Sequence, residues 1–215
     1  MSNEFVPALR FSVLTRLYDR VIAATMEEDA HRRALLAQAG LRPGHRVLDL
    51  GCGTGTFALL AKTSIPGATV IGLDADEEAL ELAWAKARAQ RVDVAFQRGF
   101  ADEARFEDAS FDRVTSMLLF HHLTRAKKVR TLERARQILR PGGELHVADW
   151  GRPHDCIMRA AFLGVRILDG FETTADNIDG ALPALMQRAG FLDVAETRRE
   201  RTIFGTLSMY RAVAS

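Results

Sequence analysis

Two aspartates flank a glycine-rich segment whose spacing is typical of a site for a nucleotide-like ligand. An apolar run containing Asp49 leads directly into Gly51, Gly53 and Gly55, and a helix-like apolar pattern follows. Glycines allow a sharp strand-to-helix turn at positive φ and let a ligand approach the backbone closely. Asp74 lies about 20 residues beyond this turn, the separation at which a βαβ unit places an acid on ribose hydroxyls.

The details of the glycine segment disfavour the two commonest nucleotide motifs. A dinucleotide loop requires G-x-G-x-x-G, and Thr56 stands at its last position. The G-x-x-x-x-G-K-[ST] pattern of a P-loop does not occur in the sequence. Because Asp49 repels a pyrophosphate and suits a cation, we expect a ligand that is positively charged near the loop. Thr56 and Asp49 also argue against a nicotinamide-dependent oxidoreductase as the function of the chain.

These segments resemble the motifs of the class I S-adenosylmethionine-dependent methyltransferases. D-L-G-C-G-T-G at 49–55 is similar to their glycine loop, and G-L-D at 72–74 is similar to their ribose motif. Further segments match in order at 99–101, 110–117, 139–145 and 189–191, so the resemblance covers about residues 40–211. Enzymes of quinone biosynthesis and phospholipid methylation are the most similar subgroup, and its members often carry H-H-L after the fourth strand, as 121–123 do here.

The resemblance implies S-adenosyl-L-methionine as the cofactor and assigns its contacts. Asp49 is expected to orient the ammonium group, Asp74 to accept the ribose hydroxyls, and Ala75 to pack beside the adenine. Phe100 replaces the family's more usual Asp, so Asp102 is a candidate for the bond to the adenine amine. The implied cofactor-binding residues are Asp49, Gly51, Cys52, Gly53, Thr54, Gly55, Asp74, Ala75, Phe100, Ala101 and Met117. Cys52 is interpreted as the small residue of the loop, with a reactive thiol as the alternative.

The candidate catalytic residues are His121 and His122, since they follow the fourth strand at the expected rim of the site. A neutral imidazole there would remove a proton from an acceptor near pH 7, and the alternative is a purely structural role. Tyr18 and Trp150 are candidates for contact with the substrate. Methyl transfer from a sulfonium needs mainly alignment, which can supply about 7–11 kcal/mol, so no catalytic triad is required.

The elements around these residues alternate between strand and helix, which predicts a parallel sheet with helices on both faces. Strands are expected at 46–50, 69–74, 92–97, 111–119, 144–150, 191–197 and 203–213, and helices at 8–39, 74–90 and 125–139. Helical periodicity places Ala79, Leu80, Leu82, Ala83 and Ala87 on the buried side of the second helix. The resemblance implies a doubly wound, Rossmann-like α/β fold of seven mostly parallel strands with the last strand antiparallel.

At 215 residues the chain is expected to form a single methyltransferase domain. We divide it into an N-terminal helical cap (1–40), a cofactor-binding core (41–150), an apolar lid insert (151–181) and a C-terminal helix with strands (182–215). The insert is apolar around most of a helix, so it must be buried or touch an apolar ligand. We favour a substrate lid, with a homodimer interface and plain core as alternatives.

The charge and composition of the chain limit which partners it is expected to bind. The net charge of +1 gives no electrostatic case for nucleic acid. The basic segment 125–140 is interpreted as a solvated helix face, with peripheral membrane contact as the alternative. Two cysteines form neither a disulfide framework nor a metal cluster, and no metal ligands are expected. The start of the chain shows no signal peptide and no apolar run of membrane-spanning length occurs, which predicts a cytoplasmic location.

Together these features predict an S-adenosylmethionine-dependent methyltransferase that acts on a small, rather apolar acceptor, such as a quinone-like molecule, a lipid or a secondary metabolite. The alternative is a module that binds the cofactor or a partner without turnover. The sequence does not distinguish among oxygen, nitrogen and carbon as the methylated atom.

Overall fold

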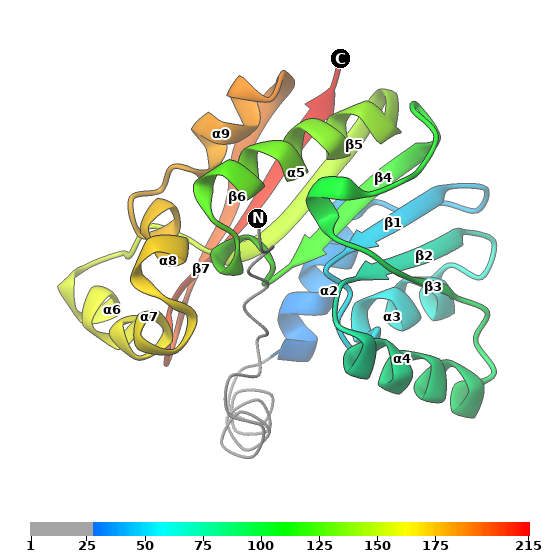
Figure 1. The fold of residues 1–215 in the computed structure, drawn as a ribbon, viewed down its shortest axis with the longest axis horizontal. Helices are drawn as coiled ribbons and strands as arrows, with labels where there is room; N and C mark the ends of the chain where they lie inside the picture. Colours follow the sequence, from blue (N-terminus) through cyan, green and yellow to red (C-terminus); the bar gives the residue numbers. More distant parts are fainter. Residues whose placement is uncertain (1–27) are drawn as a thin grey trace, which may run out of the picture.

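The computed structural model describes residues 28–215, and within this range the chain forms one seven-stranded sheet between two layers of helices (Figure 1). The order of the strands is β3-β2-β1-β4-β5-β7-β6. Their bounds are β1 (Arg46–Leu50), β2 (Thr69–Asp74), β3 (Ala95–Arg98), β4 (Phe111–Met117), β5 (Leu139–Trp150), β6 (Phe191–Thr202) and β7 (Gly205–Ala214).

The strands β1 to β5 pair in parallel, whereas β7 runs antiparallel to both of its neighbours, β5 and β6. This arrangement confirms the predicted fold class, including the antiparallel last strand. The chain builds the sheet outward in one direction from β1 and then returns to place β4 on the other side of β1. Ligands of open α/β sheets bind at such a switch point, beyond the carboxyl ends of the strands.

Helices cover both faces because the central parallel strands β1, β2 and β4 are buried on both sides, whereas the edge strand β3 is mostly exposed. On one face lie α2 (Glu28–Ala39), α3 (Thr56–Ser64) and α4 (Glu77–Gln90), and on the other lie α5 (Arg125–Ile138) and α9 (Leu182–Arg188) (Figure 1). Leu80 and Ala83 anchor α4 in one core cluster, and Leu132 and Ile138 anchor α5 in the other.

Side-chain caps fix where the two long helices begin. Asp76 accepts hydrogen bonds from the backbone N–H groups of Glu78 (2.9 Å) and Ala79 (3.2 Å) at the start of α4. Thr124 caps α5 by accepting from the N–H of Lys127. Such caps are worth about 1 kcal/mol each. They fix where the chain enters α4 after the carboxyl end of β2 and where it enters α5 after the carboxyl end of β4.

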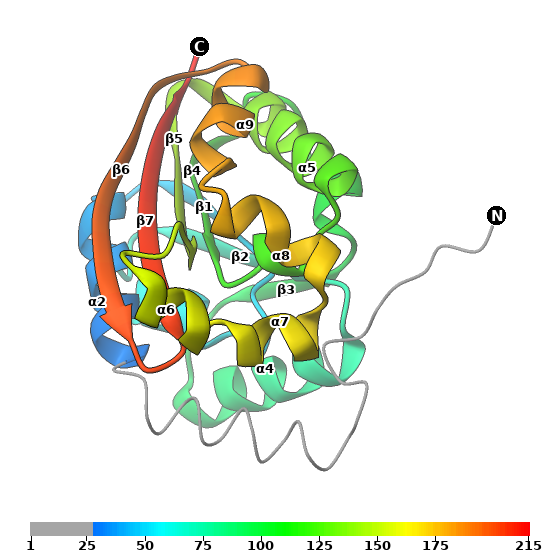
Figure 2. The same cartoon turned by 90° about the vertical axis from the view of Figure 1, so that its left-hand side faces the viewer.

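The segment 151–181 forms three short helices at the carboxyl end of the sheet: α6 (Cys156–Ala161), α7 (Leu163–Asp169) and α8 (Phe171–Ile178) (Figure 2). Phe162, Val165 and Ile178 are buried together with Trp150 in a small separate core. Other large apolar side chains of the insert are exposed, namely Ile157, Leu163, Ile167, Leu168 and Phe171. The insert therefore has both buried and exposed apolar residues, and its roles as substrate lid or plain core stay predictions. The homodimer interface stays a prediction.

Several expected boundaries and faces differ in the structure. The second helix begins at Glu77 rather than Asp74, because Asp76 is its cap. Leu82, expected in the core, keeps 55% of its surface exposed. The third strand begins at Ala95 rather than at position 92, and the fourth ends at Met117 rather than at position 119.

Two of the predictions concern the beginning of the chain. The helix expected at 8–39 is described only from Glu28, and Tyr18 lies outside the described residues. Among residues 28–215, no helix is both long enough and apolar enough to cross a bilayer.

Candidate cofactor and acceptor site

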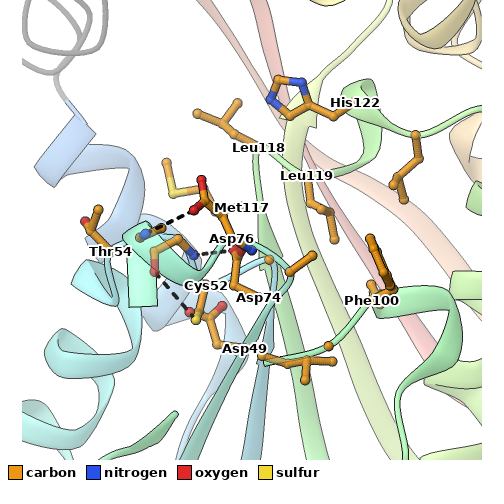
Figure 3. A pocket seen from close by; sticks show the side chains of 18 of the residues that line it. Asp49, Cys52, Thr54, Asp74, Asp76, Phe100, Met117, Leu118, Leu119 and His122 are labelled. Atoms are coloured by element: carbon orange, nitrogen blue, oxygen red, sulfur yellow. Dashed lines mark hydrogen bonds between the residues drawn. The ribbon is translucent and has the colours of Figure 1, made fainter. Parts of the chain in front are cut away.

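A cavity of about 950 Å³ opens beyond the carboxyl ends of β1, β2 and β4, at the switch point of the sheet (Figure 3). Every implied cofactor-binding residue except Gly55 lines it. Its walls also include parts of α4, the first turn of α5 and Thr173 of α8. The cavity therefore combines residues from both halves of the sheet with one residue of the insert.

Asp49 lies at the bottom of the cavity, 2% exposed, near the end of β1. Its Oδ1 accepts a hydrogen bond from Thr115 Oγ1 at 3.1 Å, and its Oδ2 has no hydrogen-bond partner among the described residues. The pKa of this carboxyl group is raised to about 7, mainly by burial; the Thr115 hydrogen bond opposes this rise and the nearby Asp74 adds to it. A buried, half-satisfied carboxylate is costly, so this position fits a cationic ligand group.

The glycine loop is held in a conformation that few other residues could adopt. Gly51 has φ +68°, and a Cβ on it would lie 2.8 Å from Cδ1 of Leu119. Its N–H donates to the carbonyl of Leu73 at 2.8 Å, and the N–H of Gly53 donates to Oδ2 of Asp74 at 2.7 Å. The turn from β1 into α3 is thereby fastened to the end of β2.

Asp74 uses both carboxylate oxygens to shape this edge of the cavity. Oδ2 accepts from Gly53, and Oδ1 accepts from the N–H of Asp76 at 2.9 Å. Burial raises the pKa of Asp74, and the backbone hydrogen bonds oppose that shift. Because a carboxylate offers about four acceptor sites, these bonds leave acceptor capacity for hydroxyl groups of a ligand.

Phe100 and Asp102 also line the cavity, Phe100 directly before the short helix η1 (Ala101–Glu103) and Asp102 within it. Lys127 Nζ lies 5.2 Å from the centroid of the Phe100 ring, within cation–π range. Asp102 forms an ion pair of 2.8 Å with Arg130. The bond proposed between Asp102 and an adenine amine stays a prediction.

The loop after β4 forms an apolar wall made of Met117, Leu118 and Leu119 (Figure 3). Leu118 has φ +56°, a conformation that costs roughly 1 kcal/mol or more for a non-glycine residue. Its N–H donates to the carbonyl of Ala148 at 2.8 Å, which holds the loop against β5. Strain of this kind persists only where the surroundings impose it, and here it directs two leucines at the cavity.

The two candidate histidines differ in position. His121 is buried, its Nδ1 lies 2.9 Å from Oδ1 of Asp149, and it does not line the cavity. His122 does line the cavity, and 34% of its side chain is exposed. Desolvation at the wall, followed by the neighbouring His121, lowers the pKa of His122 below its ordinary value. Trp150 is 3% exposed, packs against Phe162 with ring centroids 5.3 Å apart, and does not line this cavity.

Several cavity residues were not predicted from the sequence. Leu82 of α4 was assigned to the core by helical periodicity, which does not distinguish a core face from a face that lines a cavity. Arg32 of α2 and Thr173 of α8 belong to elements whose packing the sequence pattern does not specify. Lys86 reaches the glycine loop from α4, where a lysine on a helix surface gives no distinguishing signal.

The structure also bears on two open alternatives. Burial raises the pKa of the Cys52 thiol, so a reactive thiolate is not formed near neutral pH. In the basic segment, Arg125, Lys128, Arg130, Arg134 and Arg140 each form an ion pair with an acid of the chain. These pairs weaken the case for membrane contact, which stays a prediction.

Comparison with known proteins agrees with this geometry. A family described as "Methyltransferase domain" matches residues 47–143. An uncharacterized methyltransferase of Synechocystis sp. is 30% identical over 87% of this chain and 84% of its own length. The demethylmenaquinone methyltransferase of Deinococcus radiodurans is 33% identical over 68% of this chain, and the match spans 59% of that enzyme.

Solved structures show the same fold. A SAM-dependent methyltransferase from Aquifex aeolicus superposes with a TM-score of 0.69 at 18% identity, covering 95% of this chain and 98% of the other. The orphaned oxygen of Asp49 and the remaining acceptor sites of Asp74 fit the ammonium and ribose ends of S-adenosylmethionine. The chain belongs to the class I S-adenosylmethionine-dependent methyltransferase family.

Proposed function

We propose that the protein methylates a small, apolar acceptor that binds between the cofactor and the insert 151–181. The observation that carries this proposal is the division of one cavity into two chemically different parts. Asp49, Asp74 and the glycine loop make one part polar, whereas Leu118, Leu119 and Leu123 make the other apolar. An apolar wall favours an uncharged acceptor because burying a charge there without a partner is costly.

We assign the cofactor contacts from the polar part. Asp49 binds the ammonium group, since its Oδ2 is buried without a partner among the described residues. Asp74 accepts the ribose hydroxyls, and Ala75 and Phe100 contact the adenine from the cavity wall. Bound S-adenosylmethionine supplies a methyl group on a positively charged sulfur, which is already activated toward a nucleophile. The remaining task of the chain is to align the acceptor and exclude water.

We assign acceptor contact to the wall after β4. His122 is the candidate histidine that lines the cavity, together with Leu118 and Leu119. Leu82 enters from α4 on the other side, which accounts for a large apolar residue exposed on that helix. The similarity to a demethylmenaquinone methyltransferase supports a quinol-like acceptor, although this chain spans 59% of that relative.

The test is a methyl-transfer assay with radiolabelled S-adenosylmethionine and a matched pair of acceptors. A reduced naphthoquinone that lacks its ring methyl and carries a short isoprenoid tail represents the apolar class, and phosphoethanolamine represents the charged class. We expect labelled product from the quinol and none from phosphoethanolamine. The Asp74→Ala variant is the negative control, because it removes the assigned ribose contact. Turnover of phosphoethanolamine without turnover of the quinol would overturn the proposed acceptor class.

A further inference from the structure

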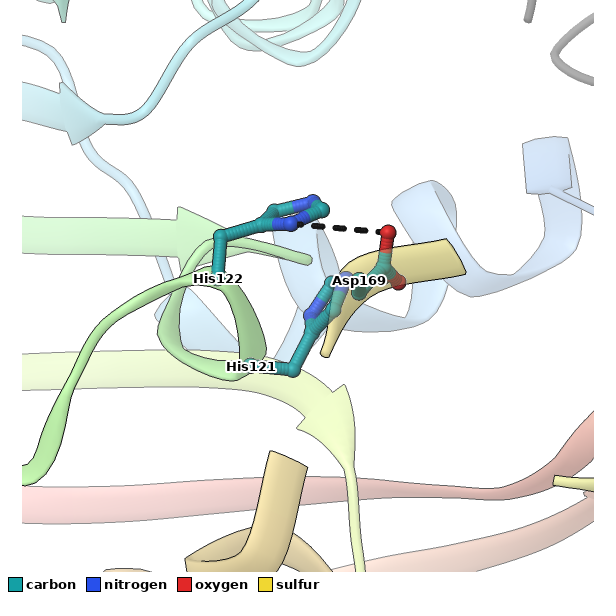
Figure 4. A group of neighbouring side chains, drawn as sticks. All are labelled: His121, His122 and Asp169. Carbon is teal, nitrogen blue, oxygen red and sulfur yellow. Dashed lines mark ion pairs between the residues drawn. The ribbon is translucent and has the colours of Figure 1, made fainter. Parts of the chain in front are cut away.

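Three side chains with metal-binding atoms meet where the insert packs against the loop after β4. His121 and His122 belong to the short helix η2 (Phe120–His122), and Asp169 is the last residue of α7. One donor atom from each residue lies within 4.8 Å of the other two. Figure 4 shows both imidazole rings beside the carboxylate. Among residues 28–215, this is the one group of three or more such ligands.

The separations between these atoms are close to those of an occupied metal site. Nε2 of His121 lies 3.6 Å from Oδ2 of Asp169, and Nδ1 of His122 lies 3.7 Å from Oδ1. Bonds of about 2.0–2.2 Å to nitrogen and oxygen place two tetrahedral ligands roughly 3.4 Å apart. Both histidine–carboxylate separations are thus close to this value, and the donor atoms of the three residues all lie within 4.8 Å of one another.

A second carboxylate holds His121 in the orientation that metal ligation requires. Asp149 is fully buried, and its oxygens accept hydrogen bonds of 2.7 Å from the N–H groups of both Phe120 and Trp150. It remains an acceptor toward Nδ1 of His121 at 2.9 Å, so this nitrogen carries the proton. In the neutral ring the lone pair then lies on Nε2, which faces the carboxylate of Asp169. Carboxylate, histidine and metal in series are the usual arrangement around metal-bound imidazoles.

We infer that His121, His122 and Asp169 bind one divalent transition-metal ion. Two imidazoles and one carboxylate suit Zn²⁺ and its neighbours rather than Mg²⁺ or Ca²⁺, which prefer oxygen ligands. Three protein ligands leave a position for water or for an oxygen atom of the acceptor. His122 also lines the cavity, so the ion lies beside the acceptor end of the site. Only this acceptor contact rests on the proposed function, and the metal binding itself does not.

The ligands come from segments 47 positions apart, which is why the sequence suggested no metal site. Two of them are fixed on the core, and the third is carried by the insert. An ion at this position joins the insert to the loop after β4. Metal binding is therefore expected to increase thermal stability, since a ligand that binds only the folded state raises the melting temperature.

The test uses untagged protein that has been treated with EDTA and dialysed into metal-free buffer. ZnCl₂ is titrated by calorimetry, and CoCl₂ provides a visible absorption spectrum that reports its ligands. We expect one ion per chain and a higher melting temperature. Asp169→Asn and His122→Gln are expected to weaken binding at least about tenfold. The matched control is Asp179→Asn, an exposed acid at the end of the same insert, which leaves the affinity unchanged.

Two outcomes decide against the metal site. The absence of stoichiometric binding of both Zn²⁺ and Co²⁺ overturns it, as does wild-type affinity in both ligand variants. Binding of S-adenosylhomocysteine is measured in the same metal-free samples. If cofactor binding persists while metal binding fails, only the metal site is rejected. If metal binding persists without any methyl transfer to the tested acceptors, the metal site stands and the proposed function fails.

Discussion

Lys86 on α4 donates a hydrogen bond of 2.6 Å from Nζ to Oγ1 of Thr54 in the glycine loop. The same ammonium group lies 3.2 Å from the carbonyl oxygen of Thr54 and 3.1 Å from Oγ1 of Thr56. The side chain of Lys86 thus holds Thr54 and Thr56 of the loop from α4. Because Thr54 also lines the cavity, this contact joins the position of α4 to the shape of the cofactor site.

Replacing this lysine is expected to weaken cofactor binding without unfolding the protein. Lys86→Met keeps the length of the side chain and removes the charge-assisted hydrogen bonds to the loop. Loss of such bonds costs about 1.5–3 kcal/mol, so the dissociation constant of S-adenosylhomocysteine should rise roughly 10- to 100-fold. Calorimetry measures it, with Arg88→Met on the exposed side of the same helix as control. Equal affinities in the two variants would show that the loop does not depend on Lys86.

The assignment of Asp74 predicts that Asp74→Ala prevents cofactor binding while the fold persists. The change removes the assigned ribose contacts together with the acceptor for the N–H of Gly53. We expect affinity to fall about 100-fold or more, with a far-UV circular dichroism spectrum unchanged from wild type. The control is Asp93→Ala, which removes an exposed acid that follows α4. Wild-type affinity in Asp74→Ala would contradict the ribose assignment.

The raised pKa of Asp49 predicts how the affinity for the cofactor depends on pH. Its pKa in the ligand-free protein is raised to about 7 by burial, so below pH 7 the carboxyl group is mostly protonated. Binding an ammonium group requires the ionised form, hence a proton must leave as the ligand binds. The affinity for S-adenosylhomocysteine should therefore be roughly tenfold weaker at pH 6 than at pH 8. Calorimetry in buffers of different ionisation enthalpy measures both the affinity and the released proton.

The matched variant for this experiment is Asp49→Asn, which keeps the size of the side chain and cannot ionise. It should bind more weakly than wild type, and its affinity should change less between pH 6 and pH 8. A wild-type affinity that stays constant across this range would contradict the assigned ammonium contact.

The contacts of Lys128 with the insert predict how much this lysine contributes to the stability of the protein. Its side chain is fully buried, and Nζ donates to the carbonyl of Thr173 at 2.6 Å and lies 3.4 Å from Oδ2 of Asp176. Lys128→Met leaves the buried carboxylate of Asp176 with the exposed Arg125 as its one ion-pair partner within residues 28–215. Removing one partner of a buried pair costs about 3–5 kcal/mol, which urea denaturation measures. The double variant Lys128→Met with Asp176→Asn should recover part of this loss, and equal stability of the two variants would contradict the pairing.

The central part of the fold was predictable because its signals are local. The strand at 46–50 and the strand at 69–74 have the predicted bounds, since each is a short apolar run ended by a glycine or an acid. The glycine spacing and Asp74 likewise predicted which residues line one half of the cavity.

The other half of the site depends on tertiary packing that the sequence pattern does not report. Leu82 was misassigned because helical periodicity cannot distinguish a core from a ligand cavity when both are apolar. Trp150 was expected beside the substrate because it ends β5, but the insert folds over it and buries it against Phe162. The meeting of His121 with Asp169 depends on where α7 ends, and no local rule predicts that position.

The insert has a small core of its own, formed by Phe162, Val165 and Ile178 against Trp150 and Leu207. This cluster is separate from the two clusters that hold the sheet and its covering helices. Substitutions among the buried residues of the insert are thus expected to change its own packing without disturbing the packing beneath the glycine loop. The acceptor side proposed above and the cofactor side therefore rest on separate cores, so each can be altered by mutation while the other is kept.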